Sequence, residues 1–321
     1  EGSASSTSCG WRQKGRADVI QGSPVRQTRR VTRIRLDLAY DGGGFTGWAK
    51  QPGQRTVQGE LEAALATIFR KVGTAPTLTV AGRTDVGVHA TGQVAHLDLD
   101  DAQLADLDRP RRGGPAPRGL EALARRLNGI AGAAGDVQVQ SATLAPPGFD
   151  ARFAAVWRRY EYRIADAVAL RDPRRRGYEL WHPTALDEEA MQTAAHGLLG
   201  LHDFASFCRP REGATTIRTL QEFAWSRDAD GVLVARVRAD AFCHSMVRAL
   251  VGACLAAGGG KLTPARVAEL RDAAARTSEF AVVPATGLTL VEVGYPPDEE
   301  LAARAEQTRA KRSFDPDETL D

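Results

Sequence analysis

The stretch AGRTDVGVHATGQVAHLD (81–98) links two segments with the composition of β-strands. We expect strands near Leu78–Ala81 and Gln93–Asp98, because β-branched and apolar residues dominate both. Between them, Gly82 and Gly87 flank a tight Arg-Thr-Asp core. Glycines on both sides allow a backbone conformation that presents a strained, exposed side chain. The stretch therefore predicts two strands joined by a connection that displays Asp85.

The segments around this connection predict the rest of a first unit, residues 31–147. An alternating strand precedes it and a helix separates the two, while another helix and strand follow. Their expected ranges are Arg33–Tyr40, Thr56–Arg70, Leu120–Ile130 and Asp136–Leu144. The order β-α-β-β-α-β is that of ferredoxin-like domains.

The same order recurs in a second unit, residues 148–297. The expected strands are Trp157–Ala165, Ile217–Ser226, Val232–Ala239 and Leu288–Val293, and the expected helices are Asp187–Leu199 and two that begin near His244 and Pro264. The fold class is therefore predicted as α+β, with two ferredoxin-like halves whose mainly antiparallel sheets flank a central cleft.

Three segments lack this periodicity. Residues 1–30 are predicted to be a disordered basic tail, and 298–321 a polar C-terminal tail that could begin as a helix. The run RPRRGGPAPR (109–118) predicts an exposed basic loop.

Composition restricts the function. The 321 residues carry 42 basic and 40 acidic side chains, a net charge of +2, so a uniformly basic nucleic-acid binder is excluded. Any RNA surface must come from local clusters, of which the candidates are Arg29–Arg35, Arg109–Arg112, Arg158–Arg159 and Arg171–Arg176.

The four cysteines form no C-x-x-C pair and indicate neither a zinc site nor an obvious disulfide framework, which favours a reducing compartment. With no signal-peptide core and no apolar run of membrane length, we expect a cytoplasmic protein without a membrane partner.

Other familiar patterns fail on their context. Gly42, Gly44 and Gly47 satisfy G-x-G-x-x-G, but Pro52 and Gly53 follow where a dinucleotide site needs a helix. The run GGGK (258–261) has no Ser or Thr after its lysine, so a helix end is the better reading. His202, Cys208, Cys243 and His244 match no metal-ligand spacing; buried cysteines and helix-capping histidines explain them better. We expect no metal and no cofactor.

Asp85 is the candidate for chemistry, although an isolated loop Asp usually only bonds nearby amides. Arg83 lies two residues away and could meet the carboxylate or a phosphate. Arg248 begins an apolar helix of the other half, where an arginine either extends to solvent or pairs with a carboxylate. Pairing with Asp85 across the cleft would keep the carboxylate ionised.

With these motifs in place, the chain resembles the TruA family of tRNA pseudouridine synthases. The resemblance covers about 33–297, in the segments YDGGGFTGWAKQ (40–51), TVQGELEAAL (56–65), AGRTDVGVHATGQVAH (81–96), LNGI (127–130), FDARFAAVWRRYEYRI (149–164), FASFC (204–208), FCHSMVRALVG (242–252) and GLTLVEVGYP (287–296). Departures occur at Ala49, Ala154 and Ser245, and none is the proposed nucleophile.

The resemblance implies the pseudouridine synthase fold and assigns roles. Asp85 would be the catalytic nucleophile, Tyr160 would contact the target uracil, Arg83 would help extrude the nucleotide, Arg248 would pair with Asp85, and Leu288 would pack beneath the base. It further implies a homodimer that isomerises uridine at positions 38, 39 and 40 of the tRNA anticodon arm, without a cofactor.

Two alternatives stay open from the residues alone. A non-catalytic RNA-binding protein with ferredoxin-like halves would need surface aromatics on a central strand and no Asp flanked by Arg. A glycoside hydrolase would need a second carboxylate as proton donor, and none stands out.

Overall fold

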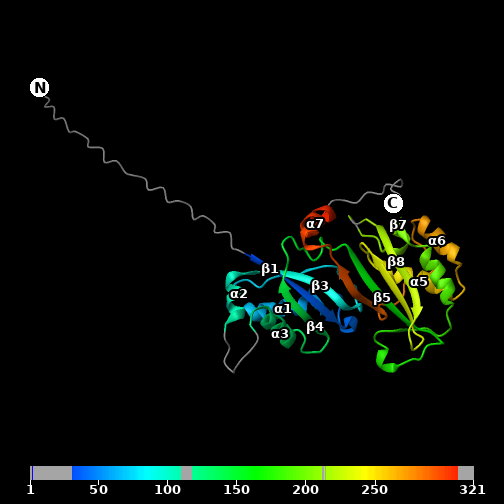
Figure 1. Cartoon of the computed structure of the whole chain (residues 1–321), viewed down its shortest axis with the longest axis horizontal. Coiled ribbons are helices and arrows are strands. Elements are labelled where there is room, and N and C mark those ends of the chain that lie inside the picture. Colours follow the sequence, from blue (N-terminus) through cyan, green and yellow to red (C-terminus); the bar gives the residue numbers. More distant parts are fainter. Residues whose placement is uncertain (1, 3–30, 110–117, 212, 214, 310–321) are drawn as a thin grey trace.

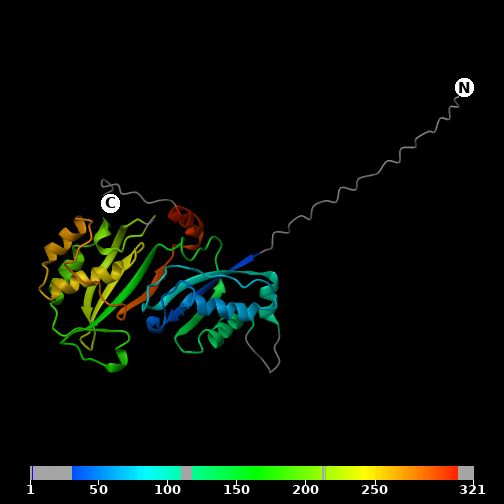
Figure 2. The ribbon, with the colours of Figure 1, turned by 180° about the vertical axis from the view of Figure 1, so that it is seen from behind.

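The computed structural model describes residues 2, 31–109, 118–211, 213 and 215–309. They form an α+β fold around one ten-stranded sheet of order β4-β1-β3-β10-β5-β9-β8-β7, with β2 beside β3 and β6 beside β5. Pairing is antiparallel except for β3 with β10 and β5 with β6. Figures 1 and 2 show the sheet from its two sides, with the helices of both halves gathered on one face.

The N-terminal half contains β1 (Val31–Tyr40), α1 (Val57–Phe69), β2 (Thr79–Val80), β3 (His89–Asp100), α2 (Asp101–Asp108), α3 (Gly119–Ile130) and β4 (Val137–Leu144). Ile34, Leu36 and Leu38 alternate along β1 and are fully buried, as a strand with one covered face requires. Helix α1 begins at Thr56, whose side chain accepts a hydrogen bond from Gly59 N.

The C-terminal half contains β5 (Trp157–Ala165), β6 (Leu180–Trp181), α4 (Glu188–His196), β7 (Gly200–Asp203), β8 (Ile217–Arg227), β9 (Leu233–Ala239), α5 (Met246–Gly258), α6 (Pro264–Asp272) and β10 (Leu288–Gly294). Helix α5 is buried over almost its whole circumference, which explains its nearly continuous apolar sequence.

Strand β10 joins the two halves. It pairs with β3 at Thr289–His89 and Leu290–Ala90, and with β5 along Leu288–Gly294. The prediction of two separate sheets was therefore wrong, because the unpaired edge of β3 takes up the last strand of the other half. The coarser prediction, an α+β protein with a mainly antiparallel sheet, is confirmed.

The C-terminal segment begins with a helix, as its sequence allowed. Residues Leu301–Arg309 form α7, and Leu301 and Ala305 are buried. These two apolar positions, four residues apart, lie on the same side of the helix. The predicted tail 1–30, apart from Gly2, and nearly all of the 109–118 loop lie outside the described residues. No helix in the described part of the chain is long and apolar enough to cross a bilayer.

Candidate active site

The loop of residues 81–88 carries Asp85 and rests on buried polar side chains. Gln93, which is fully buried, donates from Nε2 to the Gly82 carbonyl (2.8 Å) and to the Tyr40 hydroxyl (3.1 Å). Tyr40 in turn shares a 2.8 Å hydrogen bond with the hydroxyl of Thr84. Burial raises the pKa of Tyr40 to about 12, so its phenol stays protonated at neutral pH. This network fixes the residue that precedes Asp85.

A glycine-rich segment packs on the other side of the same loop. Trp48 N donates to Thr84 O (3.1 Å), and Gly47 has φ +79°. A Cβ at Gly47 would lie 2.9 Å from Thr84 O, and one at Gly42 would lie 2.0 Å from Val88 O. Gly42 and Gly47, which belong to the G-x-G-x-x-G pattern, therefore allow their backbone to pack directly against the backbone of the Asp85 loop.

Both carboxylate oxygens of Asp85 face the C-terminal half. His244 Nε2 lies 3.6 Å from Oδ1, and Ser245 Oγ donates to Oδ2 at 3.4 Å. The Asp85 side chain remains 33% exposed. The loop thus presents the carboxylate to solvent and to the start of α5 together.

Sequence reasoning missed these two neighbours. It made His244 a helix cap, whereas the N-cap of α5 is Ser245, at φ 62° and with no capping hydrogen bond from its side chain. The sequence held no signal for this, because only the structure shows that Ser245 does not cap the helix and that its hydroxyl bonds Asp85.

Tyr160 lies close to this site. It is 8% exposed on β5, and its ring meets Phe242 edge-on at 5.1 Å between centroids. Burial raises the pKa of Tyr160, and the neighbouring Tyr40 and Asp85 add to the rise. The two side chains lie near enough for Asp85 to contribute to this electrostatic shift.

The other three predicted residues surround this pair. Arg83 is exposed on the loop itself. Leu288 is 4% exposed at the start of β10, two residues before the partner of Tyr160 in the sheet. Arg248 on α5 donates from Nε to Val283 O (2.6 Å). No Arg248–Asp85 ion pair occurs among the described residues; the Nε atom of Arg248 bonds the Val283 carbonyl.

Arg158 has a role that its place in a basic cluster did not suggest. It is 9% exposed and donates to the carbonyls of Ala81 (2.8 Å), Asp240 (2.9 Å) and Arg152 (3.0 Å). Burial lowers its pKa. Arg158 is thus too buried to line an RNA path; it fastens the base of the Asp85 loop to the end of β9.

The structure also joins Cys208 and Cys243 in a disulfide, with Cα atoms 5.7 Å apart. The spacing of the cysteines indicated no obvious disulfide framework, because these two residues, 35 positions apart, meet only through the packing of β7, β8 and α5. Among the described residues, no group of three or more His, Cys, Asp or Glu side chains could hold a metal ion.

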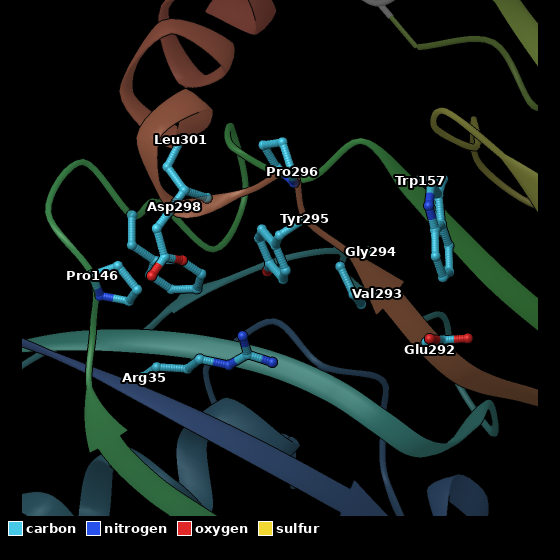
Figure 3. A pocket seen from close by; sticks show the side chains of 11 residues that line it. Arg35, Pro146, Trp157, Glu292, Val293, Gly294, Tyr295, Pro296, Asp298 and Leu301 are labelled. Atoms are coloured by element: carbon cyan, nitrogen blue, oxygen red, sulfur yellow. The ribbon is translucent and has the colours of Figure 1, made fainter.

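A pocket lies apart from these residues, at the base of α7 (Figure 3). The Arg35 guanidinium stacks there over the rings of Phe149 (5.7 Å) and Tyr295 (5.3 Å). Tyr295 also donates to Ala151 O at 2.7 Å. These contacts secure the connection between the halves, and no residue of the Asp85 site lines the pocket.

Comparisons with known proteins show the family of this chain. The sequence profile of a family described as tRNA pseudouridine synthase matches residues 194–296. The chain is 63% identical to tRNA pseudouridine synthase A of Leifsonia xyli over 287 residues, which are 89% of this chain and 100% of that protein. This chain belongs to the tRNA pseudouridine synthase family.

Two further relatives of this chain are also named tRNA pseudouridine synthase A. The protein from Frankia casuarinae is 56% identical, over 88% of this chain and 96% of its own length. The one from Streptomyces griseus is 53% identical, over 88% and 94%. The enzyme class, an isomerase, follows from the family and confirms the prediction.

Proposed function

We propose that this chain converts uridine to pseudouridine in tRNA, at positions 38, 39 and 40 of the anticodon arm, with Asp85 as its nucleophile and no cofactor. The observation that carries the proposal is the presentation of Asp85. A rigid loop at the junction of the two halves holds its carboxylate one-third exposed, beside a buried tyrosine. Placement of a reactive group on a preorganised support is what covalent catalysis requires.

The reaction breaks the N-glycosidic bond and forms a C–C bond at C5 of the base. The carboxylate begins it by attacking C6 of the base or C1′ of the ribose, or by removing a proton from C2′. The base then rotates, rejoins through C5 and loses the C5 proton. Because the target uridine must leave its stack, an aromatic side chain is suited to bind the extruded base, and Tyr160 supplies one.

The neighbouring residues support complementary roles. Arg83 is exposed on the loop that carries Asp85, which supports a role in contacting the backbone of an extruded nucleotide. Leu288 on β10 is buried beside Tyr162 of β5 and supplies an apolar surface beneath the base. Arg248 lies three residues after Ser245, so it contributes to binding from the same helix end rather than by pairing with Asp85.

The segment before α4 supports an RNA-binding surface. The Arg174 side chain is 89% exposed, and Arg171 lies over the ring of Trp181 at 5.7 Å. Exposed guanidinium groups beside aromatic rings can neutralise phosphates and stack on bases. We assign this surface to the anticodon arm, in a cytoplasmic homodimer.

We also assign each half to the ferredoxin-like type. The neighbours run β4-β1-β3-β2 in the N-terminal half and β10-β5-β9-β8 in the C-terminal half. The two orders correspond strand by strand, which supports a repeated unit.

The test is Asp85→Asn, which keeps the size of the side chain and removes its charge. We expect a folded protein that binds tRNA within about tenfold of the wild type, or ~1.4 kcal/mol, and shows no turnover. Turnover is measured as single-turnover tritium release from tRNA labelled at C5 of uridine. Asp272→Asn is the matched control, because that carboxylate is 62% exposed on α6 and outside the site.

The alternative function, a non-catalytic RNA-binding protein with ferredoxin-like halves, predicts the opposite pattern. It requires that the wild type bind tRNA without releasing tritium. Release by Asp85→Asn would instead remove Asp85 from the nucleophile role.

A further inference from the structure

The disulfide between Cys208 and Cys243 lies at the edge of the candidate site. Cys208 follows the short 3-10 turn Ala205–Phe207 and is 4% exposed, whereas Cys243 is only partly buried. Their Cα atoms lie 5.7 Å apart, a distance that a disulfide can bridge. Arg209 N donates to His244 O (3.0 Å), so the two backbone segments run side by side here.

The residues around Cys243 all touch the site. Phe242 packs edge-on against Tyr160, His244 Nε2 lies 3.6 Å from Asp85 Oδ1, and Ser245 Oγ bonds Asp85 Oδ2 at 3.4 Å. A covalent link at Cys243 therefore sets the positions of three neighbours of the reacting groups. We name residues 242–245 the facing segment.

The facing segment is conformationally strained. Ser245 has φ 62°, one of two non-glycine residues with positive φ among those described. Such a conformation costs free energy and persists where the surroundings impose it. The disulfide lies two residues earlier in the same segment.

We propose that Cys208 and Cys243 form a reversible redox pair, and that the oxidised pair slows turnover by holding the facing segment against the Asp85 carboxylate. The effect on turnover rests on the proposed function; the pairing of the thiols does not. In reducing compartments, protein disulfides are usually transient, catalytic or redox-sensing, which fits such a role.

The exchange needs only a low-molecular-weight disulfide as oxidant. The thiolate of the more accessible Cys243 attacks one sulfur of that disulfide, forms a mixed disulfide and releases one thiolate. The Cys208 thiolate then attacks the Cys243 sulfur, closes the protein disulfide and releases the second thiolate. The protein loses two protons and two electrons, and the small disulfide gains the electrons.

Cys254 provides an internal control. It is fully buried and unpaired in the structure, and burial raises the pKa of its thiol to about 12. A thiol of this kind holds almost no thiolate at neutral pH, so it does not react with the probe.

The experiment exposes the full-length protein to 2-hydroxyethyl disulfide or to dithiothreitol and maps free thiols by alkylation and mass spectrometry. Single-turnover tritium release is then compared between the two states. We expect oxidation to link Cys208 with Cys243, to leave Cys254 unchanged and to slow release about threefold to tenfold, as small misplacements at a reacting group do. Dithiothreitol should restore the rate.

The variant Cys208→Ser separates the explanations. Its Cys243 should form a mixed disulfide with the oxidant, because the second thiol is missing. Since no protein disulfide then closes, oxidation should not slow turnover in this variant as it does in the wild type. Cys243→Ser should leave Cys208 unreactive and the rate insensitive to the probe. Serine is nearly the same size as cysteine, so we expect both variants to fold. If one does not fold, the other still tests the proposal.

Each outcome bears on the proposal. Thiols that stay unpaired under oxidant, a paired form with the same or a faster rate, or equal slowing in Cys243→Ser would each overturn it. Absence of tritium release from the wild type in both states would contradict the proposed function instead, and the alkylation map alone would then decide the pairing.

Discussion

The two sides of the Asp85 site are held by different means. On the N-terminal side, the loop of residues 81–88 is fixed by Gln93, Tyr40 and close backbone contacts with Gly42 and Gly47. On the C-terminal side, the facing segment is held by a disulfide and by backbone hydrogen bonds that its carbonyls accept from Arg209, Met246 and Ala249, and it contains a strained Ser245.

The difference separates a fixed element from an adjustable one. The loop rests on many contacts between uncharged groups. Loss of any single contact should therefore leave Asp85 in place, unless the backbone of the loop must also move. The facing segment rests on a few constraints, one of which is chemically reversible. A preorganised nucleophile opposite an adjustable partner admits a large substrate without loss of alignment.

The largest effect is expected from Gly47→Ala, which breaks the fixed side. The new Cβ would lie 2.9 Å from Thr84 O and 3.3 Å from Asp85 C, so the loop must shift. A shift of ~1 Å costs roughly a hundredfold in rate. Tritium release measures the loss.

The matched control for this change is Gly53→Ala. Gly53 has a similar φ of +68° but nothing lies within 4 Å of the added Cβ. Both variants carry the same backbone strain, and only Gly47→Ala pushes on the loop. Equal rates for the two would show that the loop is not rigid.

A smaller effect is expected from Asp166, which stabilises the C-terminal half away from both elements. Burial alone would raise the pKa of Asp166, but hydrogen bonds from Arg227 and from the amides of Leu186 and Val168 outweigh it and lower the pKa to about 2. A lowered pKa means that this stabilisation is complete above pH ~4 and is lost as pH falls towards 2.

Asp166→Asn should therefore lower the free energy of unfolding by about 2 kcal/mol at pH 7, and by less as pH falls below 4. Urea unfolding at several pH values measures this. Asp172→Asn is the control, since Asp172 pairs with the highly exposed Arg174 and should contribute little. A fall in turnover per folded molecule would mean that the adjustable side depends on global stability.

The smallest effect is expected from Ser245→Gly, which sharpens the comparison. Glycine accepts φ 62° without strain but adds freedom to the unfolded chain, so the net gain in unfolding free energy is about 0.5 kcal/mol. Ser245→Ala loses the hydroxyl and keeps the strain. Ala274→Gly, at φ 45° and outside the site, is the control for strain alone. A loss of stability in Ser245→Gly would show that the segment is not strained.

Local sequence patterns predicted most elements, because alternation and helical spacing report on one covered face. The strand at Val31–Tyr40 and the helix at Val57–Phe69 lie within a few residues of their predicted ranges. Helix α2 and strand β7 were missed, since eight and four residues give too short a pattern.

Long-range contacts could not be read in the same way. The pairing of β10 with β3 involves two residue pairs separated by 200 positions, and no local pattern encodes it. The motif around Asp85 predicted the loop, but the approach of His244 and Ser245 depends on how α5 is placed. Arg248 could extend or pair, and its hydrogen bond to Val283 O is a tertiary outcome.

The central place of β10 has a consequence for synthesis of the protein. This strand comes last among the ten, yet it lies between β3 and β5 and borders both Tyr160 and the Asp85 loop. During translation the first half can pair β1, β3 and β4, but the two halves join only after Gly294 has left the ribosome. A nascent chain therefore carries the aspartate long before the two halves that form the site have joined.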